Sequence, residues 1–106
     1  MATLAIVGGT LIDGGGGDPV RNASVVIEGE RIVAAGPAVT VPKGAQVLDA
    51  GGRTILPGII DCHVHGTYRA RDMRQHLLNA PTYNVLRSTA VLKETLACGV
   101  TTASTS

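Results

Sequence analysis

Two histidines separated by one residue stand at the end of an apolar run. The sequence from Leu56 to Gly66 reads LPGIIDCHVHG, so Asp61, His63 and His65 occupy alternate positions. Successive side chains of a β-strand point to opposite faces, which places the aspartate and both histidines on one face. Residues at i and i+2 lie roughly 6.5 to 7 Å apart at Cα, so both imidazoles can reach one divalent ion. The spacing alone also fits two solvated histidines, but the Pro-Gly pair, the apolar run and the acid favour a metal site.

Several polar residues near this motif are candidates for further roles. Asp61 is a candidate to orient a metal ligand from outside the coordination sphere, and the alternative is that it orders the strand-to-loop backbone. Tyr68 borders the expected site and is a candidate for substrate contact. His76 has no partner at metal-ligand spacing, which favours a loop or helix surface. Three arginines follow the histidines and either meet a substrate carboxylate or form a solvated basic loop: Arg69, Arg71 and Arg74.

The residues before Pro57 are short β-prone runs separated by glycines. The runs and their connections are 3–7, 10–12, the glycine-rich loop 13–19, 24–36 and the pair of runs in 45–56. Glu28-Gly29-Glu30 predicts a hairpin, because glycine accepts a positive φ at a tight turn. The glycine loop lacks the spacing of a phosphate-binding loop and is interpreted as a hairpin connection. We therefore predict short antiparallel strands over residues 1–56.

The pattern changes at Pro57. We predict a strand over 59–65 and a helix over 82–97, where apolar residues recur every three or four positions. Pro81 precedes this helix and Gly99 follows it, as is typical of helix ends. A further β-prone run begins at Val100, so the segment predicts a βαβ unit. In a closed (β/α)8 barrel the C-terminal ends of the strands face the active site, which is where the two histidines would lie.

Composition excludes several classes of protein. The chain has 106 residues, of which 44% are hydrophobic, a formal net charge of +1 and no Phe or Trp. Scattered arginines give no basic patch for nucleic acid, and the sequence offers neither an export signal nor a membrane span. Cys62 and Cys98 are far apart and are expected to be buried, reduced thiols. We expect a soluble cytoplasmic protein without nucleic-acid or membrane partners.

Four stretches of the sequence together resemble the amidohydrolase superfamily. LPGIIDCHVHG resembles the first strand of its barrel, and VVIEGERIVAAGP with VPKGAQVLDAGGRTILPG resembles the N-terminal half of its small β-sandwich. LKETLACGVTT resembles the end of the first barrel helix and the start of the second strand, although the ASTS that follows departs from the usual apolar residue and Arg-Asp. The most similar groups are imidazolonepropionase-like and Xaa-Pro dipeptidase-like. The resemblance implies an α/β fold, a (β/α)8 barrel with a small β-sandwich, of which this chain is only the N-terminal part. Residues 1–56 would form half of the composite sandwich domain, and residues 57–106 would begin the barrel and stop in its second strand.

The resemblance also implies a chemistry. Members hydrolyse amide, peptide or cyclic amide C–N bonds with a metal-activated water, and by match His63 and His65 are metal ligands. The metal is commonly zinc, in a site that is often binuclear and that residues beyond 106 would complete. No catalytic residue is expected in this chain, which alone would be inactive and would bind zinc weakly. The implied partners are a small amide or dipeptide-like substrate, the rest of the same polypeptide or a complementing chain, and further copies in a homo-oligomer. The alternative is a small non-catalytic β-rich binding or assembly module whose histidines are incidental.

Incompleteness predicts uncovered apolar surface. Half a sandwich and a single βαβ unit each lack neighbours, so we expect exposed apolar side chains on the predicted hairpin and on one helix face: Val25, Ile27, Ile32 and Ala34, with Leu92 and Leu96. At about 25 cal/mol per Å² of apolar surface, a few hundred Å² left in water forfeits several kcal/mol. The chain is therefore expected to be ordered only as part of something larger.

Overall fold

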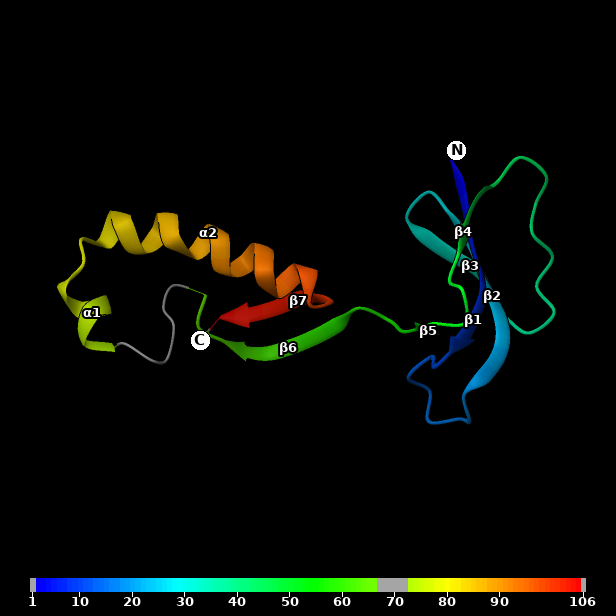
Figure 1. Ribbon diagram of the computed structural model, residues 1–106, viewed down its shortest axis with the longest axis horizontal. Coiled ribbons are helices and arrows are strands. Elements are labelled where there is room, and N and C mark those ends of the chain that lie inside the picture. The colour runs from blue at the N-terminus through cyan, green and yellow to red at the C-terminus, as the bar shows by residue number, and fades with distance from the viewer. Residues whose placement is uncertain (1, 67–72, 106) are drawn as a thin grey trace. The chain divides into compact units, whose positions relative to one another are not determined.

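The computed structural model describes residues 2–66 and 73–105. The chain divides into two compact units, Met1–Pro57 and Gly58–Ser106. Among the described residues, the first unit contains strands without helices, and the second contains two strands and two helices. Figure 1 shows these elements along the chain, coloured from the N-terminus to the C-terminus.

The first unit is a five-stranded sheet built around β1. Its strands are β1 (Thr3–Leu11), β2 (Val20–Glu28), β3 (Arg31–Gly36), β4 (Gln46–Asp49) and β5 (Thr54–Ile55). The order is β3-β2-β1-β4, with β5 also paired to β1 (Figure 1). The β1–β2 and β2–β3 pairs are antiparallel, as predicted. The second pair turns at Gly29, whose φ of 62° allows the predicted hairpin, and the loop 13–19 connects β1 to β2.

The prediction of antiparallel strands throughout residues 1–56 is wrong for β4 and β5. Both strands run parallel to β1. The Gly51-Gly52 turn, with φ of 56° and 77°, steps the chain sideways without reversing it. The Gly52 amide donates to the Gly8 carbonyl at 2.8 Å, so the turn lies against β1.

The predicted break at Gly8-Gly9 is instead a bulge within one continuous strand. Ile6 pairs with Val25 and Gly9 pairs with Ala23, so β1 contains one residue more than β2 between these pairs. Gly8, within this stretch, has a φ of 68°. A Cβ at Gly9 would lie 2.6 Å from the Ile55 side chain, which explains why glycine is needed there. The bulge bends β1 where its parallel partner changes from β4 to β5.

The core of the first unit is small and lies on both faces of β2. Its buried side chains are Ala5, Leu11, Ala23, Val25 and Val26. The expectation that Val25 belongs to an uncovered face is wrong, because it is 4% exposed and clusters with Leu11 and Ala23. Ile32 on β3 is 68% exposed, as expected for a side chain without an opposing layer.

The second unit has the predicted strand–helix–strand order. Its elements are β6 (Ile59–Val64), α1 (Met73–Leu78), α2 (Pro81–Ala97) and β7 (Val100–Thr105). Strands β6 and β7 are parallel and paired (Figure 1). Helix α2 begins at Pro81, and after it Gly99 adopts a φ of 93°, as its two end signals predicted. The short helix α1 was not predicted.

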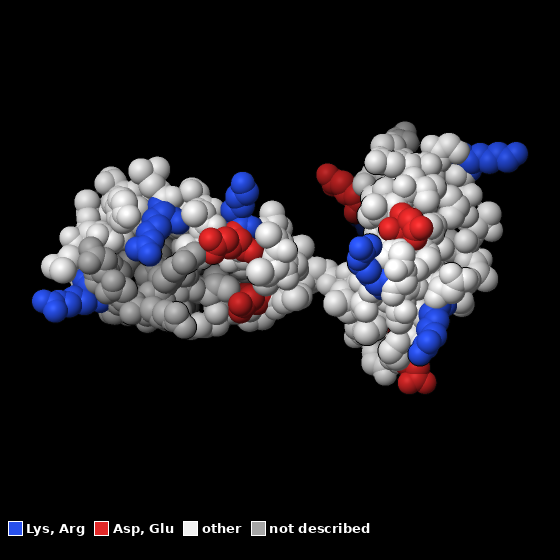
Figure 2. All heavy atoms as spheres, viewed as in Figure 1, with Lys and Arg blue, Asp and Glu red and all other residues white. Residues whose placement is uncertain are grey.

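Charged and apolar side chains share the surface of both units. Lysines and arginines are interspersed with acidic residues on the face that Figure 2 shows. No helix in the described part of the chain is long and apolar enough to cross a membrane. On helix α2, Leu86, Leu92 and Leu96 are 72%, 47% and 61% exposed. These values agree with the expectation of an uncovered helix face.

We predict that the purified chain does not fold as a cooperative monomer. Its exposed leucines, isoleucines and valines leave apolar area in water that forfeits several kcal/mol, comparable with the whole stability of a small domain. Sedimentation and light scattering should therefore report association that covers these faces. A monomer with one sharp unfolding transition would contradict the prediction.

Candidate metal centre

The two histidines of the motif lie at the C-terminal end of β6. His63 belongs to the strand, and His65 follows its last residue, Val64. Their Nε2 atoms are 3.1 Å apart. The ring centroids are 4.8 Å apart and the ring planes are at 86°. The prediction that both histidines share one face is confirmed, and both side chains are exposed.

This separation suits two ligands of one metal ion. Zinc binds imidazole nitrogen at about 2.0–2.1 Å, and two such nitrogens at an angle of about 100° are about 3.1 Å apart. Without a metal, one ring donates its N–H to the other, and the tautomers decide which does so. Imidazole is also a preferred ligand of divalent zinc. The donor atoms and their separation therefore fit the group that the sequence implies.

The pair does not form a complete catalytic site in the described part of the chain. Residues 2–66 and 73–105 contain no group of three or more His, Cys, Asp or Glu side chains that could hold a metal. A catalytic zinc typically takes three protein ligands and keeps one position for water or substrate. Two imidazoles supply part of that set.

A bulge shapes the strand at the histidines. The register steps from the pair Asp61–Ala103 to the pair Val64–Thr105, so three steps along β6 match two along β7. The Oδ1 atom of Asp61 accepts a hydrogen bond from the backbone N–H of His63 at 3.1 Å. This contact fits the second of the two alternatives for Asp61, that its side chain orders the backbone between the strand and the loop. The alternation of residue types gave no signal of the bulge, because the extra residue is visible only against β7.

The end of the motif lies beside α2. A Cβ on Gly66 would be 3.6 Å from Cδ2 of Leu92, an ordinary van der Waals distance. At the start of β6, the amide of Ile59 donates a hydrogen bond at 2.9 Å to the carbonyl of Gly99, which follows α2. The start of the histidine strand is therefore hydrogen-bonded to the C-terminal turn of α2.

The remaining candidates are only partly placed. Tyr68, Arg69 and Arg71 lie outside the described residues. Arg74 is exposed on α1, and His76 belongs to the same helix, although its side chain is outside the description.

The expectation of buried thiols is wrong. Cys62 and Cys98 are both free, and both are exposed. Cys62 belongs to β6 of the two-stranded sheet, and Cys98 caps the C-terminus of α2. Burial of these thiols would need neighbours that this part of the chain does not supply.

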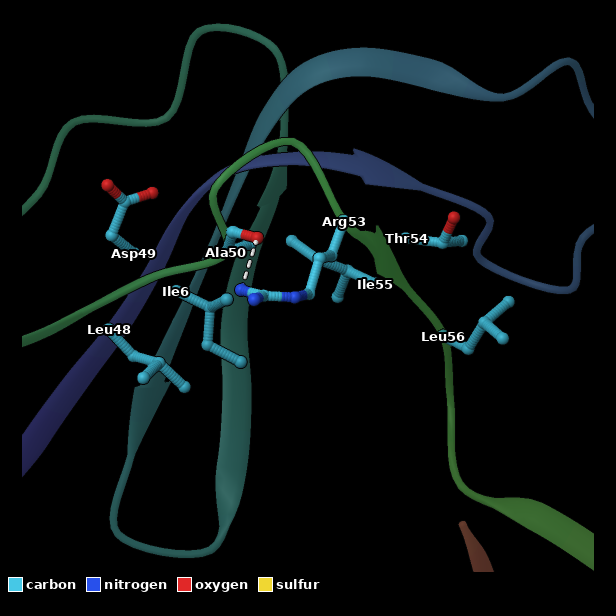
Figure 3. A pocket seen from close by; sticks show the side chains of 8 residues that line it. All are labelled: Ile6, Leu48, Asp49, Ala50, Arg53, Thr54, Ile55 and Leu56. Carbon is cyan, nitrogen blue, oxygen red and sulfur yellow. Dashed lines mark hydrogen bonds between the residues drawn. The ribbon is translucent and has the colours of Figure 1, made fainter. Parts of the chain in front are cut away.

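The first unit has a separate pocket of about 340 Å³ (Figure 3). Its apolar walls include Ile6, Leu48 and Ile55, and Arg53 extends across it. The guanidinium of Arg53 donates to the Ala50 carbonyl at 3.4 Å, and Asp49 accepts from the Gly51 amide at 2.8 Å. These polar groups therefore stabilise the turn between β4 and β5. Sequence reasoning did not identify this pocket.

Comparison with known proteins gives no matching family profile but many relatives. The N-acyl-D-aspartate deacylase of Alcaligenes xylosoxydans xylosoxydans is 48% identical over 65 residues, which are 61% of this chain and 13% of the deacylase. The imidazolonepropionase of Hyphomonas neptunium is 36% identical over 87 residues, covering 73% of this chain and 21% of that enzyme. A match that covers 65 residues of a 106-residue chain necessarily spans residues 42–65, so it contains both histidines.

Solved structures agree with these relatives. A prolidase complexed with N-methylphosphonate-L-proline is 30% identical with a TM-score of 0.84, over 98% of this chain and 26% of the prolidase. Molinate hydrolase is 34% identical with a TM-score of 0.79, over 98% of this chain and 24% of its own. A Xaa-Pro dipeptidase at 24% identity shares the fold, with a TM-score of 0.82. The chain spans between 13% and 26% of the length of these relatives. The relatives of this chain in sequence and in structure are amidohydrolases, as its motifs predicted.

Proposed function

We propose that this chain is the N-terminal segment of a longer, metal-dependent amidohydrolase and supplies two ligands of its catalytic metal, His63 and His65. The observation that carries the proposal is the convergence of the two Nε2 atoms to 3.1 Å at the end of a strand parallel to its neighbour. The rest of the same polypeptide, or a complementing chain, supplies the remaining ligands. Zinc is the ion proposed, in a mononuclear or binuclear site.

The reaction proposed is hydrolysis of an amide, peptide or cyclic amide C–N bond in a small substrate. The relatives are hydrolases by name, including deacylases, imidazolonepropionases and a deaminase. A bound zinc acidifies water and so supplies a nucleophile at neutral pH. The part of this chain is to hold two imidazole nitrogens at ligand separation on a strand whose first residue, Ile59, is hydrogen-bonded to Gly99 after α2.

The two units would have different roles in the complete enzyme. Residues 1–56 would form half of a β-sandwich, in agreement with the uncovered apolar side chains of β3 and β4. Residues 57–106 would supply the first strand and helix of a (β/α)8 barrel and part of its second strand. The parallel pairing of β6 with β7 across α2 supports this assignment, because parallel strands joined by helices are the repeating unit of that barrel.

Zinc binding to the full chain tests the proposal. Equilibrium dialysis at graded free zinc, followed by metal analysis, measures affinity in a background where exposed Cys62 and Cys98 are serine, so that thiols do not contribute. Two ligands should bind one zinc weakly and lose it on dialysis into metal-free buffer. His63→Ala or His65→Ala should each weaken binding at least about tenfold, because each removes one of the two proposed ligands.

His76→Ala is the matched control, because it removes a histidine of the same chain that has no place in the proposed pair. It should leave affinity within about twofold. Retention of one zinc per chain after exhaustive dialysis would show that ligands have been missed. Equal zinc affinity in all three histidine variants and the parent would make the histidines incidental and favour a non-catalytic module.

A further inference from the structure

We propose that Asp61 is a positioning residue for the histidine pair. Its carboxylate accepts the backbone N–H of His63 at the bulge and thereby holds His63 where its Nε2 meets that of His65. The inference rests on the proposed function insofar as the pair is a metal site. It concerns a contact to the backbone, and no contact of Asp61 with an imidazole or a metal is needed.

The bulge creates the need for this bond. In a regular parallel pair, evenly spaced ladder bonds satisfy the backbone amides. Between Asp61 and Val64 the strand contains one residue more than the matching stretch of β7, and a bulge leaves its extra residue outside the ladder. The amide of His63 lies within this stretch and donates to the Asp61 side chain instead. The carboxylate thus replaces the acceptor that β7 would have supplied.

The bulge also explains the ring geometry. Side chains at i and i+2 of a regular strand stand side by side, roughly 6.5 to 7 Å apart at Cα. Here the two rings are edge to face with centroids 4.8 Å apart, closer than the Cα spacing of a regular strand. Bulges twist a strand and re-aim its side chains, and they are frequent beside active sites. Stabilising the bulge therefore stabilises the convergence of the two nitrogens.

The same local bond occurs elsewhere in the chain, which provides a matched control. Asp49 accepts the Gly51 amide at 2.8 Å, with the same two-residue spacing, in a turn of the other unit. Removal of Asp49 tests the loss of such a bond and of one negative charge without touching β6. Only the Asp61 bond has a proposed metal ligand as its donor.

Three substitutions at Asp61 separate charge from hydrogen bonding. Asp61→Asn keeps an oxygen at the same position and loses the charge, whereas Asp61→Glu keeps the charge and moves the acceptor by one methylene. Asp61→Ala removes both. In the serine background and dialysis assay described above, we expect Asp61→Ala and Asp61→Glu to weaken zinc affinity about tenfold. This is the lower end of the loss of affinity seen when groups that orient metal ligands are removed. The zinc affinity of Asp61→Asn should remain within about threefold of that of the parent, and the affinity of Asp49→Ala within about twofold.

Hydrogen exchange at the His63 amide gives a readout that does not need metal. Exchange of the His63 amide should accelerate in Asp61→Ala and Asp61→Glu and stay near the parent rate in Asp61→Asn. The exchange rate of the Ile59 amide, which is bonded to the Gly99 carbonyl, should be unchanged in all three variants. If Asp61→Ala fails to fold, the Asn and Glu variants still decide the question. The proposal would be overturned if Asp61→Glu bound zinc as tightly as the parent, or if Asp61→Asn bound it as weakly as Asp61→Ala. In either case the negative charge, and not the position of the acceptor, would determine the affinity.

The assay distinguishes this proposal from the proposed function. If the parent chain and His63→Ala bind zinc equally, the metal site itself is wrong. If His63→Ala weakens binding and Asp61→Ala does not, the metal site stands and the positioning role of Asp61 falls.

Discussion

Replacing His63 by alanine in a complete enzyme should abolish zinc retention and lower hydrolysis by more than about 100-fold. Loss of groups that only orient metal ligands already costs roughly 10- to 100-fold in affinity or activity, and a ligand itself should cost more. A suitable enzyme is a chimera in which the matched residues of this chain replace the aligned segment of the N-acyl-D-aspartate deacylase. The matched residues of this chain include both histidines, and the remainder of the deacylase supplies the rest of an enzyme.

The chimera carries its own controls. The unsubstituted chimera should hydrolyse an N-acyl-D-aspartate and retain zinc through dialysis, which shows that the grafted strand is competent. His65→Ala should match His63→Ala, and the double variant should be scarcely worse, because residues that act as one unit are not additive. Rates near those of the unsubstituted chimera in either single variant would contradict the ligand assignment. Circular dichroism of each variant separates loss of zinc from loss of fold.

Substituting alanine for Gly58 should destabilise the second unit by about 3 kcal/mol, the upper part of the usual range for overpacking. The register between Ile59 and Ile60 contains an extra residue on β7, Thr101. A Cβ added at Gly58 would overlap Oγ1 of Thr101 and lie 2.6 Å from Cγ2 and 2.8 Å from Cβ of the same residue. The backbone of Gly58 does not have the positive φ that favours glycine, so the effect is steric. Hydrogen exchange of the Ile59 amide in the full chain should accelerate by about 100-fold, as that free energy implies.

The steric cause predicts a specific rescue. Thr101→Gly removes every side-chain atom that the new Cβ would meet and should restore slow exchange, whereas Thr101→Ala keeps the Cβ contact at 2.8 Å and should restore it only partly. Gly17→Ala is the matched control, since a Cβ there meets nothing within 4 Å and Gly17 also lacks a positive φ. Unchanged exchange in Gly58→Ala would show that the two strands pair differently.

The sequence alone predicted the features that depend on local periodicity. Alternation placed His63 and His65 on one face of β6, because side chains in a strand repeat every two residues. Pro81 and Gly99 located the ends of α2 to within a residue or two, because their backbone preferences act at the position where they occur. The resemblance carried by LPGIIDCHVHG also identified the superfamily that the relatives confirm.

Only the tertiary structure decided how strands pair and what covers them. The parallel course of β4 and β5 depends on hydrogen bonds from the Gly51-Gly52 turn to β1, which no local pattern encodes. Burial of Val25 and exposure of Cys62 likewise depend on which layers meet each strand face. The bulge at His63 exists only as a mismatch with β7, a strand that follows a whole helix later. Residue type and spacing fix which face a histidine occupies, but the 3.1 Å separation of the two nitrogens and the register against a distant strand are properties of the folded chain.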